Sequence, residues 1–161
     1  MSRIEELQKQ IKELNEKLEA EIEKSKDVEC PLEEGDGYFV LCNDGSFMSD
    51  CWEDYGCERD IWLQGNIFKT EREAKLESDR RALLAKFKRF RDKRNGDWKP
   101  ELDKVKHYIC LKCETFRLSV TSSIYWASFN MFGYFKDKQD AERAIELFGD
   151  EIKRLFVEVE Q

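Results

Sequence analysis

Two segments far apart in this chain carry the same short pattern, and this repetition limits the folds that the chain can adopt. Residues 68–74 read Phe-Lys-Thr-Glu-Arg-Glu-Ala, and residues 135–141 read Phe-Lys-Asp-Lys-Gln-Asp-Ala. In each, an apolar residue and a Lys precede a residue suited to cap a helix, and an Ala follows within the first turn. Thr70 with Glu73 is the signature of a capping box, and Asp137 is the corresponding cap in the second segment. The chain is therefore predicted to contain two similar junctions between a strand and a helix.

Each junction follows a stretch with strand character. Residues 37–42 and 46–52 are expected to form a hairpin around an Asp-Gly turn, and residues 106–111 and 115–120 a second hairpin. A further strand is expected around residues 129–135. We predict an α+β fold of two duplicated β-β-(β)-α units, residues 38–95 and 106–156, whose hairpins join into one antiparallel sheet with both helices on one face. Because the same capping chemistry recurs at many helix starts, independent origin of the two units is the alternative.

The N-terminal residues 3–24 favour an amphipathic helix with a narrow apolar stripe. Its members are spaced by three and four residues, and the next position of the heptad is Glu21. Ile at a and Leu at d favour parallel two-stranded pairing, although three heptads are marginal for a coiled coil that forms alone. A second copy, the chain's own domain or another protein must cover the stripe; we expect a homodimer. The candidate oligomerisation residues are Ile4, Leu7, Ile11, Leu14 and Leu18.

Composition supports three parts: an N-terminal helix at residues 1–29, a linker rich in Gly and acidic residues at 30–37, and the α+β domain at 38–161. The 161 residues include 28 Lys and Arg against 35 Asp and Glu, a net charge of −7. This balance argues against general affinity for nucleic acid or anionic lipid. No apolar run of about 18 residues and no secretion signal occurs. The expected location is the cytoplasm of a host bacterium, with no membrane contact.

Catalytic and metal sites find little support in the sequence. The single histidine, His107, lies six residues from Cys113, about 20 Å away if both lie on one extended strand. Cys110 and Cys113 have the spacing of a zinc knuckle, and Cys51 and Cys57 could complete a four-sulfur site. Cysteines on strands are, however, ordinarily small apolar side chains. We expect no enzymatic activity, no metal and no cofactor.

Acidic and aromatic residues alternate in residues 50–60. Trp and Tyr often anchor interfaces, and carboxylates can imitate phosphates when they dock on a basic groove. The alternative is a solvated loop that folds Trp52 and Trp62 into the core. The candidate partner-binding residues are Asp50, Trp52, Glu53, Asp54, Tyr55, Glu58 and Asp60.

The predicted helix at residues 70–94 supports a different hypothesis, that the chain itself binds nucleic acid through a basic face. Residues 71–94 hold ten basic against five acidic side chains, and several basic residues recur at helical spacing away from the apolar stripe. Such a basic face could bind the phosphates of a nucleic-acid backbone. A charged helix face is, however, usually only exposed to solvent, and the net charge of −7 means that the rest of the chain would repel DNA. The candidate nucleic-acid-binding residues are Arg72, Lys75, Lys86, Arg89 and Lys93.

Three motifs together resemble a known family. Residues 65–74 read Gly-Asn-Ile-Phe-Lys-Thr-Glu-Arg-Glu-Ala, residues 98–100 read Trp-Lys-Pro, and residues 134–145 read Tyr-Phe-Lys-Asp-Lys-Gln-Asp-Ala-Glu-Arg-Ala-Ile. Over residues 38–156 the chain resembles a family of small proteins encoded by phages and prophages of Gram-positive bacteria. The resemblance implies a phage setting, in which accessory proteins of this size are often inhibitors of host defence, CRISPR nucleases among their targets. It assigns no site residues.

Taken together, these observations predict a non-enzymatic interaction protein that binds and inhibits a host defence protein. The expected activity is anti-CRISPR-like, with an acidic surface that blocks a nucleic-acid-binding channel. The alternative is a small nucleic-acid-binding or regulatory protein that uses the basic helix at residues 70–94.

Overall fold

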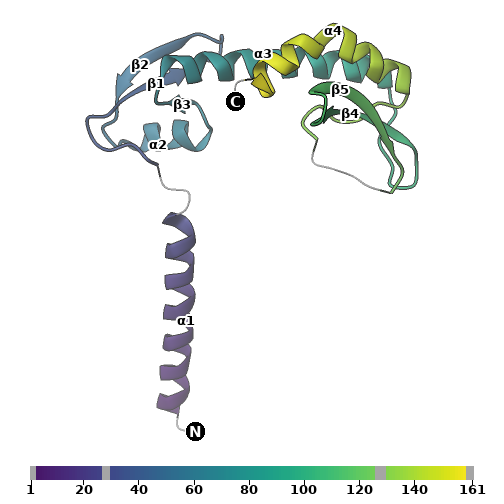
Figure 1. Cartoon of the computed structure of the whole chain (residues 1–161). Coiled ribbons are helices and arrows are strands. Elements are labelled where there is room, and N and C mark those ends of the chain that lie inside the picture. The colour runs from purple at the N-terminus through teal and green to yellow at the C-terminus, as the bar shows by residue number, and fades with distance from the viewer. Residues whose placement is uncertain (1–2, 27–29, 126–129, 159–161) are drawn as a thin grey trace.

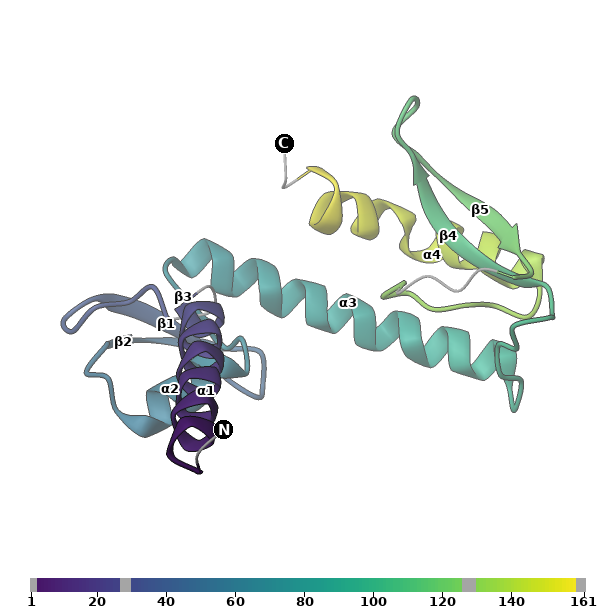
Figure 2. The ribbon, with the colours of Figure 1, turned by 90° about the horizontal axis from the view of Figure 1, so that it is seen from below.

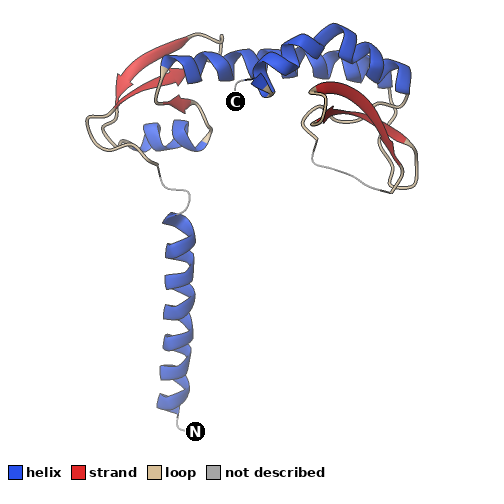
Figure 3. Ribbon diagram, in the orientation of Figure 1, coloured by secondary structure: helices blue, strands red, loops and turns tan. Residues whose placement is uncertain are grey.

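The computed structural model describes residues 3–26, 30–125 and 130–158 (Figure 1). The described part of the chain contains helices and two small antiparallel sheets (Figure 3), and this combination confirms the α+β class. The elements are α1 (Arg3–Lys26), β1 (Gly37–Leu41), β2 (Phe47–Cys51), α2 (Gly56–Leu63), β3 (Ile67–Phe68), α3 (Glu71–Asn95), β4 (Lys106–Lys112), β5 (Arg117–Ser123) and α4 (Lys138–Phe156).

The strands form two separate small sheets, and the prediction of one continuous sheet is wrong. The first sheet has the order β2-β1-β3, and the second pairs β4 with β5; all pairs are antiparallel. Figure 1 shows the two sheets near opposite ends of α3. Each hairpin finds its third partner in the short segment just before its own helix, so neither hairpin needs the other to complete its pairing.

The two halves share one order of elements. In the first half Phe39 of β1 pairs with Phe68, and in the second half His107 of β4 forms an isolated antiparallel bridge with Phe135. Each pairing is followed directly by a helix whose first-turn Ala is fully buried, Ala74 in α3 and Ala141 in α4. Of the strand predicted at 129–135, residue 129 lies outside the described residues, and only the bridge at 135 is formed. A duplication remains a prediction.

The helix caps differ in quality. Thr70 Oγ1 accepts a hydrogen bond from the Glu73 backbone N–H at 3.2 Å, and the Glu73 carboxylate accepts one from the Thr70 N–H at 3.0 Å. The predicted capping box is therefore confirmed at α3. Asp137 precedes α4 as predicted, but its side chain makes no capping hydrogen bond. The longer helix α3 thus has the better defined start.

Helix α3 presents opposite sides to the two sheets. Near its start, Ser78 Oγ donates to the Gly45 carbonyl at 2.8 Å, and Arg81 Nη2 donates to the Gly65 carbonyl at 2.9 Å, on the same side as the buried Ala74. Leu83 and Phe87 lie about half a turn around the helix, at about 100° per residue, and pack in the core under α4. Figure 2 shows α3 as a rod that joins two lobes.

The lobes have cores of unequal size. The N-terminal lobe comprises β1, β2, α2, β3 and the first turns of α3, and its Tyr38 and Trp52 rings meet edge to face at 6.0 Å. The C-terminal lobe comprises β4, β5, α4 and the rest of α3. Phe87 lies at its centre, with its ring 4.9 Å from that of Phe132 and 5.8 Å from that of Phe135. The C-terminal core cluster contains Leu83, Phe87, Ile109, Phe132, Phe135, Ala141, Ala144, Ile152 and Leu155.

Two further findings concern the helices. Residues 56–63, part of which the sequence alternative treats as a solvated loop, form α2, a helix of eight residues. No helix in residues 3–26, 30–125 and 130–158 has both the length and the apolar composition needed to cross a membrane.

Candidate interaction surface

A buried carboxylate organises the loop between β2 and α2. Glu58 is only 6% exposed, and its Oε2 accepts hydrogen bonds from the backbone N–H groups of Tyr55 at 2.8 Å and Glu53 at 3.1 Å. Its Oε1 accepts one from the Tyr38 hydroxyl at 3.0 Å. Because Glu58 lies in the first turn of α2, one side chain fixes both the loop and the start of the helix.

Two of the residues predicted to contact a partner are therefore inside the lobe. Trp52 is 2% exposed and packs against Tyr38, and Glu58 is occupied by three donors. Neither side chain can serve as a surface anchor, so the prediction for these two residues is corrected. The sequence alternative placed both Trp52 and Trp62 in the core; Trp52 is buried and Trp62 is half-buried. Glu58 instead positions the residues that remain exposed.

The surroundings of Tyr38 favour the neutral, protonated form of its hydroxyl group. Burial raises the pKa of the Tyr38 hydroxyl, and the hydrogen bond to Glu58 and the negative charge of that carboxylate raise it further. A phenolate here would lose its hydration and lie beside another anion. Tyr38 therefore stays protonated and remains a donor to Glu58 well above ordinary pH.

The exposed part of the loop is acidic and carries one large aromatic side chain. Asp50, Glu53 and Asp60 are exposed, and Tyr55 is 59% exposed. The neighbouring Glu53 carboxylate is the main cause that raises the pKa of the Tyr55 hydroxyl. We call Asp50, Glu53, Tyr55 and Asp60 the acidic surface. All four belong to the set predicted from sequence.

Asp54, the remaining predicted contact residue, has a structural role. Its backbone adopts φ of 59°, in the left-handed region that Asp tolerates better than most residues. Its carboxylate accepts a hydrogen bond from Arg59 Nε at 2.7 Å, and this bond is the main cause that lowers the pKa of Asp54. Asp54 and Arg59 largely neutralise each other at the bend before α2.

The whole N-terminal lobe is acidic beyond this loop. Residues 30–68 contain nine acidic side chains and one basic side chain, Arg59, a net charge of −8. Glu33 and Glu34 in the linker and Asp44 in the β1–β2 turn are exposed. Because the single cation of this segment already pairs with Asp54, the acidic surface has no neutralising partner within its own segment.

The predicted basic face of α3 is only partly formed. All five candidate residues are exposed, but Lys75 pairs with Asp79 at 2.6 Å. Arg72 lies about 21 Å from Lys86 along the helix axis. Lys86, Arg89 and Lys93 share one side. Ion pairs within the described part of the chain involve none of these three. They form the basic patch that remains.

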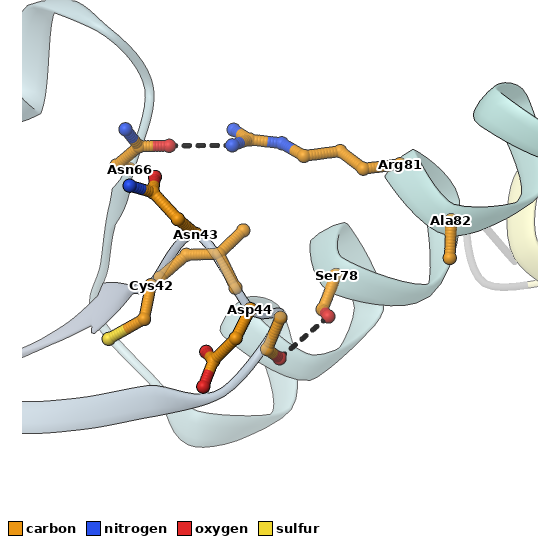
Figure 4. A pocket seen from close by; sticks show the side chains of 9 residues that line it. Cys42, Asn43, Asp44, Asn66, Ser78, Arg81 and Ala82 are labelled. Atoms are coloured by element: carbon orange, nitrogen blue, oxygen red, sulfur yellow. Dashed lines mark hydrogen bonds between the residues drawn. The ribbon is translucent and has the colours of Figure 1, made fainter.

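A polar cavity of about 480 Å³ lies where the β1–β2 turn meets α3 (Figure 4). Arg81 dominates it, but Arg81 Nη1 already donates to Asn66 Oδ1 at 2.6 Å and its Nε to Glu77 at 2.7 Å. Ser78 is likewise bonded to the turn, as the dashed line in Figure 4 shows. These contacts of Ser78 and Arg81 hold α3 to the β1–β2 turn and to the segment before β3.

The structure reveals one pair that sequence reasoning missed. His107 Nδ1 lies 2.7 Å from Ser122 Oγ, because the two residues face each other across β4 and β5. Only the hairpin register brings them together. Neither residue lines any of the described cavities, and Ser122 is exposed. The pair is a polar cross-strand contact of the ordinary kind.

The cysteines are separate thiols. All six are free, and Cys110 Sγ lies 2.9 Å from Thr121 Oγ1 on the paired strand. Cys113 is exposed in the turn that follows β4. Among residues 3–26, 30–125 and 130–158, no group of three or more His, Cys, Asp or Glu side chains could hold a metal ion.

The apolar stripe of α1 is not covered by the chain itself. The five predicted residues are between 50 and 68% exposed, and Ile22 is 48% exposed. Ile22 extends the stripe by one step of four residues beyond Leu18, in place of Glu21. The sequence contained this signal, but a strict heptad reading ends the stripe one position too early.

No protein-family model, no curated protein and no solved structure matches this chain.

Proposed function

We propose that this chain is a non-enzymatic interaction protein of the bacterial cytoplasm whose N-terminal lobe docks on a basic surface of another protein. The partner that fits best is a host defence protein that handles nucleic acid, and the proposed effect is anti-CRISPR-like inhibition. One observation carries the proposal: nine acidic residues against one basic residue in residues 30–68, with the exposed carboxylates held on an ordered lobe.

The chemistry of the acidic surface suits a channel that normally receives a phosphate backbone. Carboxylates compete with phosphates for Lys and Arg side chains, and their summed field speeds encounter with a basic partner. Tyr55 adds an exposed aromatic side chain of the kind that anchors interfaces. The three hydrogen bonds to Glu58 fix the loop before binding, so less conformational entropy is lost in the complex.

Self-association through α1 belongs to the same proposal. The apolar stripe of α1 is exposed along its whole length and requires a covering surface. A dimer would carry two acidic surfaces, and the second contact would form at a high effective concentration. Affinity for a partner with two basic sites, or for a dimeric partner, would then exceed that of one lobe.

The test is a charge reversal with a matched control. The lobe variant combines Asp50→Lys, Glu53→Lys and Asp60→Lys. The control combines Asp97→Lys, Asp103→Lys and Glu114→Lys, which are exposed acids beyond α3 and change the net charge by the same amount. Glu58 and Asp54 are left intact because their structural contacts would confuse the result.

Each tagged protein is used to capture partners from a nuclease-treated lysate of a Gram-positive bacterium. We expect the wild type and the control to retain one near-stoichiometric nucleic-acid-binding protein, which added duplex DNA displaces, and the lobe variant to lose it. Circular dichroism checks that all three proteins are folded. Retention of the same partner by the lobe variant would place the binding surface elsewhere.

A second candidate function rests on the basic patch. Lys86, Arg89 and Lys93 lie on one side of α3 and have no carboxylate partner in the described part of the chain. If they bind phosphates, affinity for a labelled duplex should fall steeply with salt, and Lys86→Glu, Arg89→Glu and Lys93→Glu together should abolish it. Undetectable binding of the wild type at low salt would remove this candidate.

A further inference from the structure

The spacing of the apolar stripe on α1, together with the charges beside it, indicates how two copies of the chain pair. We propose that α1 pairs with α1 of a second copy in parallel and in register, so that both acidic lobes follow the same end of the paired helices. This inference deepens the self-association in the proposed function and does not depend on what the acidic surface binds.

The stripe has the width of a coiled-coil seam. Its six residues follow steps of three, four, three, four and four, and all are between 48 and 68% exposed. A seam of about two residues per seven is too narrow for the face of a globular core, which needs about three. A second helix with an equally narrow apolar seam has the width needed to cover it. The a and d positions of the seam are held by Ile4, Leu7, Ile11, Leu14 and Leu18, and Ile22 lies beside the seam at position e.

The charges of α1 support a copy of the same helix as the occupant. Among described side chains the acids, apart from Glu21, lie at the outer heptad positions, where Lys9 pairs with Glu13 and Lys12 with Glu16, each at 3.9 Å. The positions that flank the seam are neutral or basic. Gln8 and Asn15 occupy one flank, and Arg3, Gln10 and Lys17 the other. A partner helix with strongly charged flanks would meet no row of opposite charges beside this seam. A second copy of α1 would place mostly neutral side chains there.

Parallel pairing satisfies these flanks. In register, the apolar residues at the a and d positions from Ile4 to Leu18 each meet the same residue of the partner, and Glu21 at the last d position meets the partner's Glu21 at the C-terminal end of the seam. Residues at position g approach those at position e of the next heptad in the partner. Arg3 then lies beside the partner's Gln8, and Lys17 beside the partner's Ile22, so no like charges meet along the flanks. Ile at a and Leu at d also favour the parallel two-stranded form.

Antiparallel pairing loses apolar layers at both ends. The best antiparallel register sets residue numbers that sum to 25 opposite each other, with Leu7 against the partner's Leu18. Ile4 then faces the partner's Glu21 at each end of the seam. A register shifted by one heptad leaves Leu18 uncovered and brings Arg3 toward the partner's Lys17. The parallel arrangement keeps five apolar layers and places one Glu21 pair at the end of the seam, whereas each antiparallel register keeps four apolar layers.

Cysteine cross-linking of the full chain distinguishes the two orientations. The variants are Ile4→Cys and Glu21→Cys, made separately and mixed in equal amounts before mild oxidation. Trypsin cuts after Lys9 and Lys24, so each new thiol lies in a short peptide of its own, apart from the native cysteines. Positions 4 and 21 are about 25 Å apart along one helix, too far for a link within one chain.

We expect links between like positions, 4 with 4 and 21 with 21, and no mixed links. Mixed 4–21 links in excess would show antiparallel pairing, and a monomeric mass by light scattering with no links would show that α1 does not self-associate; either result overturns the inference. The lobe variant described above should cross-link like the wild type. A failure of the acidic surface to bind its partner is therefore distinguishable from a failure of this inference.

Discussion

At the scale of single residues, Glu58 holds the loop that carries the acidic surface. Replacing it with Ala leaves the Tyr38 hydroxyl and the backbone N–H groups of Glu53 and Tyr55 without their buried acceptor. We expect Glu58→Ala to lower the free energy of unfolding by about 1–3 kcal/mol, measured by urea denaturation. Glu53→Ala, on the exposed side of the same loop, should change it by less than about 0.5 kcal/mol. Equal effects of the two substitutions would contradict this role of Glu58.

Tyr38 makes stability sensitive to alkaline pH. Burial and the neighbouring Glu58 raise the pKa of its hydroxyl above the ordinary value of 10.0, so the unfolded chain ionises first as pH rises. The contribution of Tyr38 to stability is complete below pH 10 and declines above it, by at most about 1.4 kcal/mol per pH unit. Tyr38→Phe should flatten the fall in unfolding free energy between pH 10 and 11. Identical slopes for the two proteins would show that the proton on Tyr38 is not linked to folding.

Local contacts were predictable at this scale, and distant ones were not. The Thr70 and Glu73 capping box follows from residues three apart, and the structure confirms it. Glu58 and Lys106 depend on the tertiary fold instead. Lys106 is 1% exposed and donates to the carbonyls of Glu101 and Ile124, although a Lys at a strand start reads as a solvated residue. No spacing rule indicates a buried charge whose acceptors are backbone atoms.

At the scale of elements, hydrophobic periodicity placed the long helices and both hairpins within a few residues of their observed bounds. It did not predict α2, because that helix is short and has no Ser, Thr, Asp or Asn cap; it follows Tyr55 instead. The single predicted sheet was wrong for a related reason. On α3 the buried side chain of Ala74 and the buried side chain of Leu83 lie on opposite sides of the helix. The sequence pattern indicates one continuous apolar stripe, although α3 has two separate packing surfaces.

The stripe of α1 gives the prediction that belongs to this scale. Leu7→Gln, Ile11→Gln and Leu14→Gln together remove three central layers of the seam, and we expect a dimer to become a monomer whose two lobes remain folded. Light scattering measures the mass, and circular dichroism the fold. The matched control carries Glu5→Gln, Lys12→Gln and Glu16→Gln on the outer side of α1 and should stay dimeric. A seam variant that keeps the wild-type mass would show that other elements hold the copies together.

At the scale of the whole molecule, charge and stability are unevenly distributed along the chain. Residues 30–68 carry −8, whereas the following residues 69–95 contain eleven basic and five acidic side chains. The acidic surface lies on the lobe with the smaller core, around Tyr38, Leu41 and Trp52, and α3 connects it to the larger aromatic core. The composition revealed the charge division, and the fold shows that the acidic segment lies in the N-terminal lobe while the basic helix α3 spans both lobes (Figure 2).

Unequal cores predict unequal local stability. Regions with few buried apolar side chains open at lower free energy than the global transition. Backbone amides of β1, β2 and α2 should therefore exchange with deuterium faster than those of β4, β5 and α4 at the same pH and temperature. The first turns of α3 should follow the N-terminal lobe, because Ser78 and Arg81 bind that lobe's turns, and its last turns should follow the C-terminal lobe.

A partner on the acidic surface should reduce this difference. Binding to the folded N-terminal lobe stabilises it by mass action and leaves the C-terminal lobe nearly unchanged. Exchange of the captured complex, compared with the free protein, should slow in β1, β2 and α2 and stay the same in α4. Equal protection of both lobes in the free protein would mean that α3 couples them into one cooperative unit. In that case a ligand that binds one lobe would also stabilise the other lobe. Binding of a partner to the acidic surface would then slow exchange in the C-terminal lobe as well, through α3.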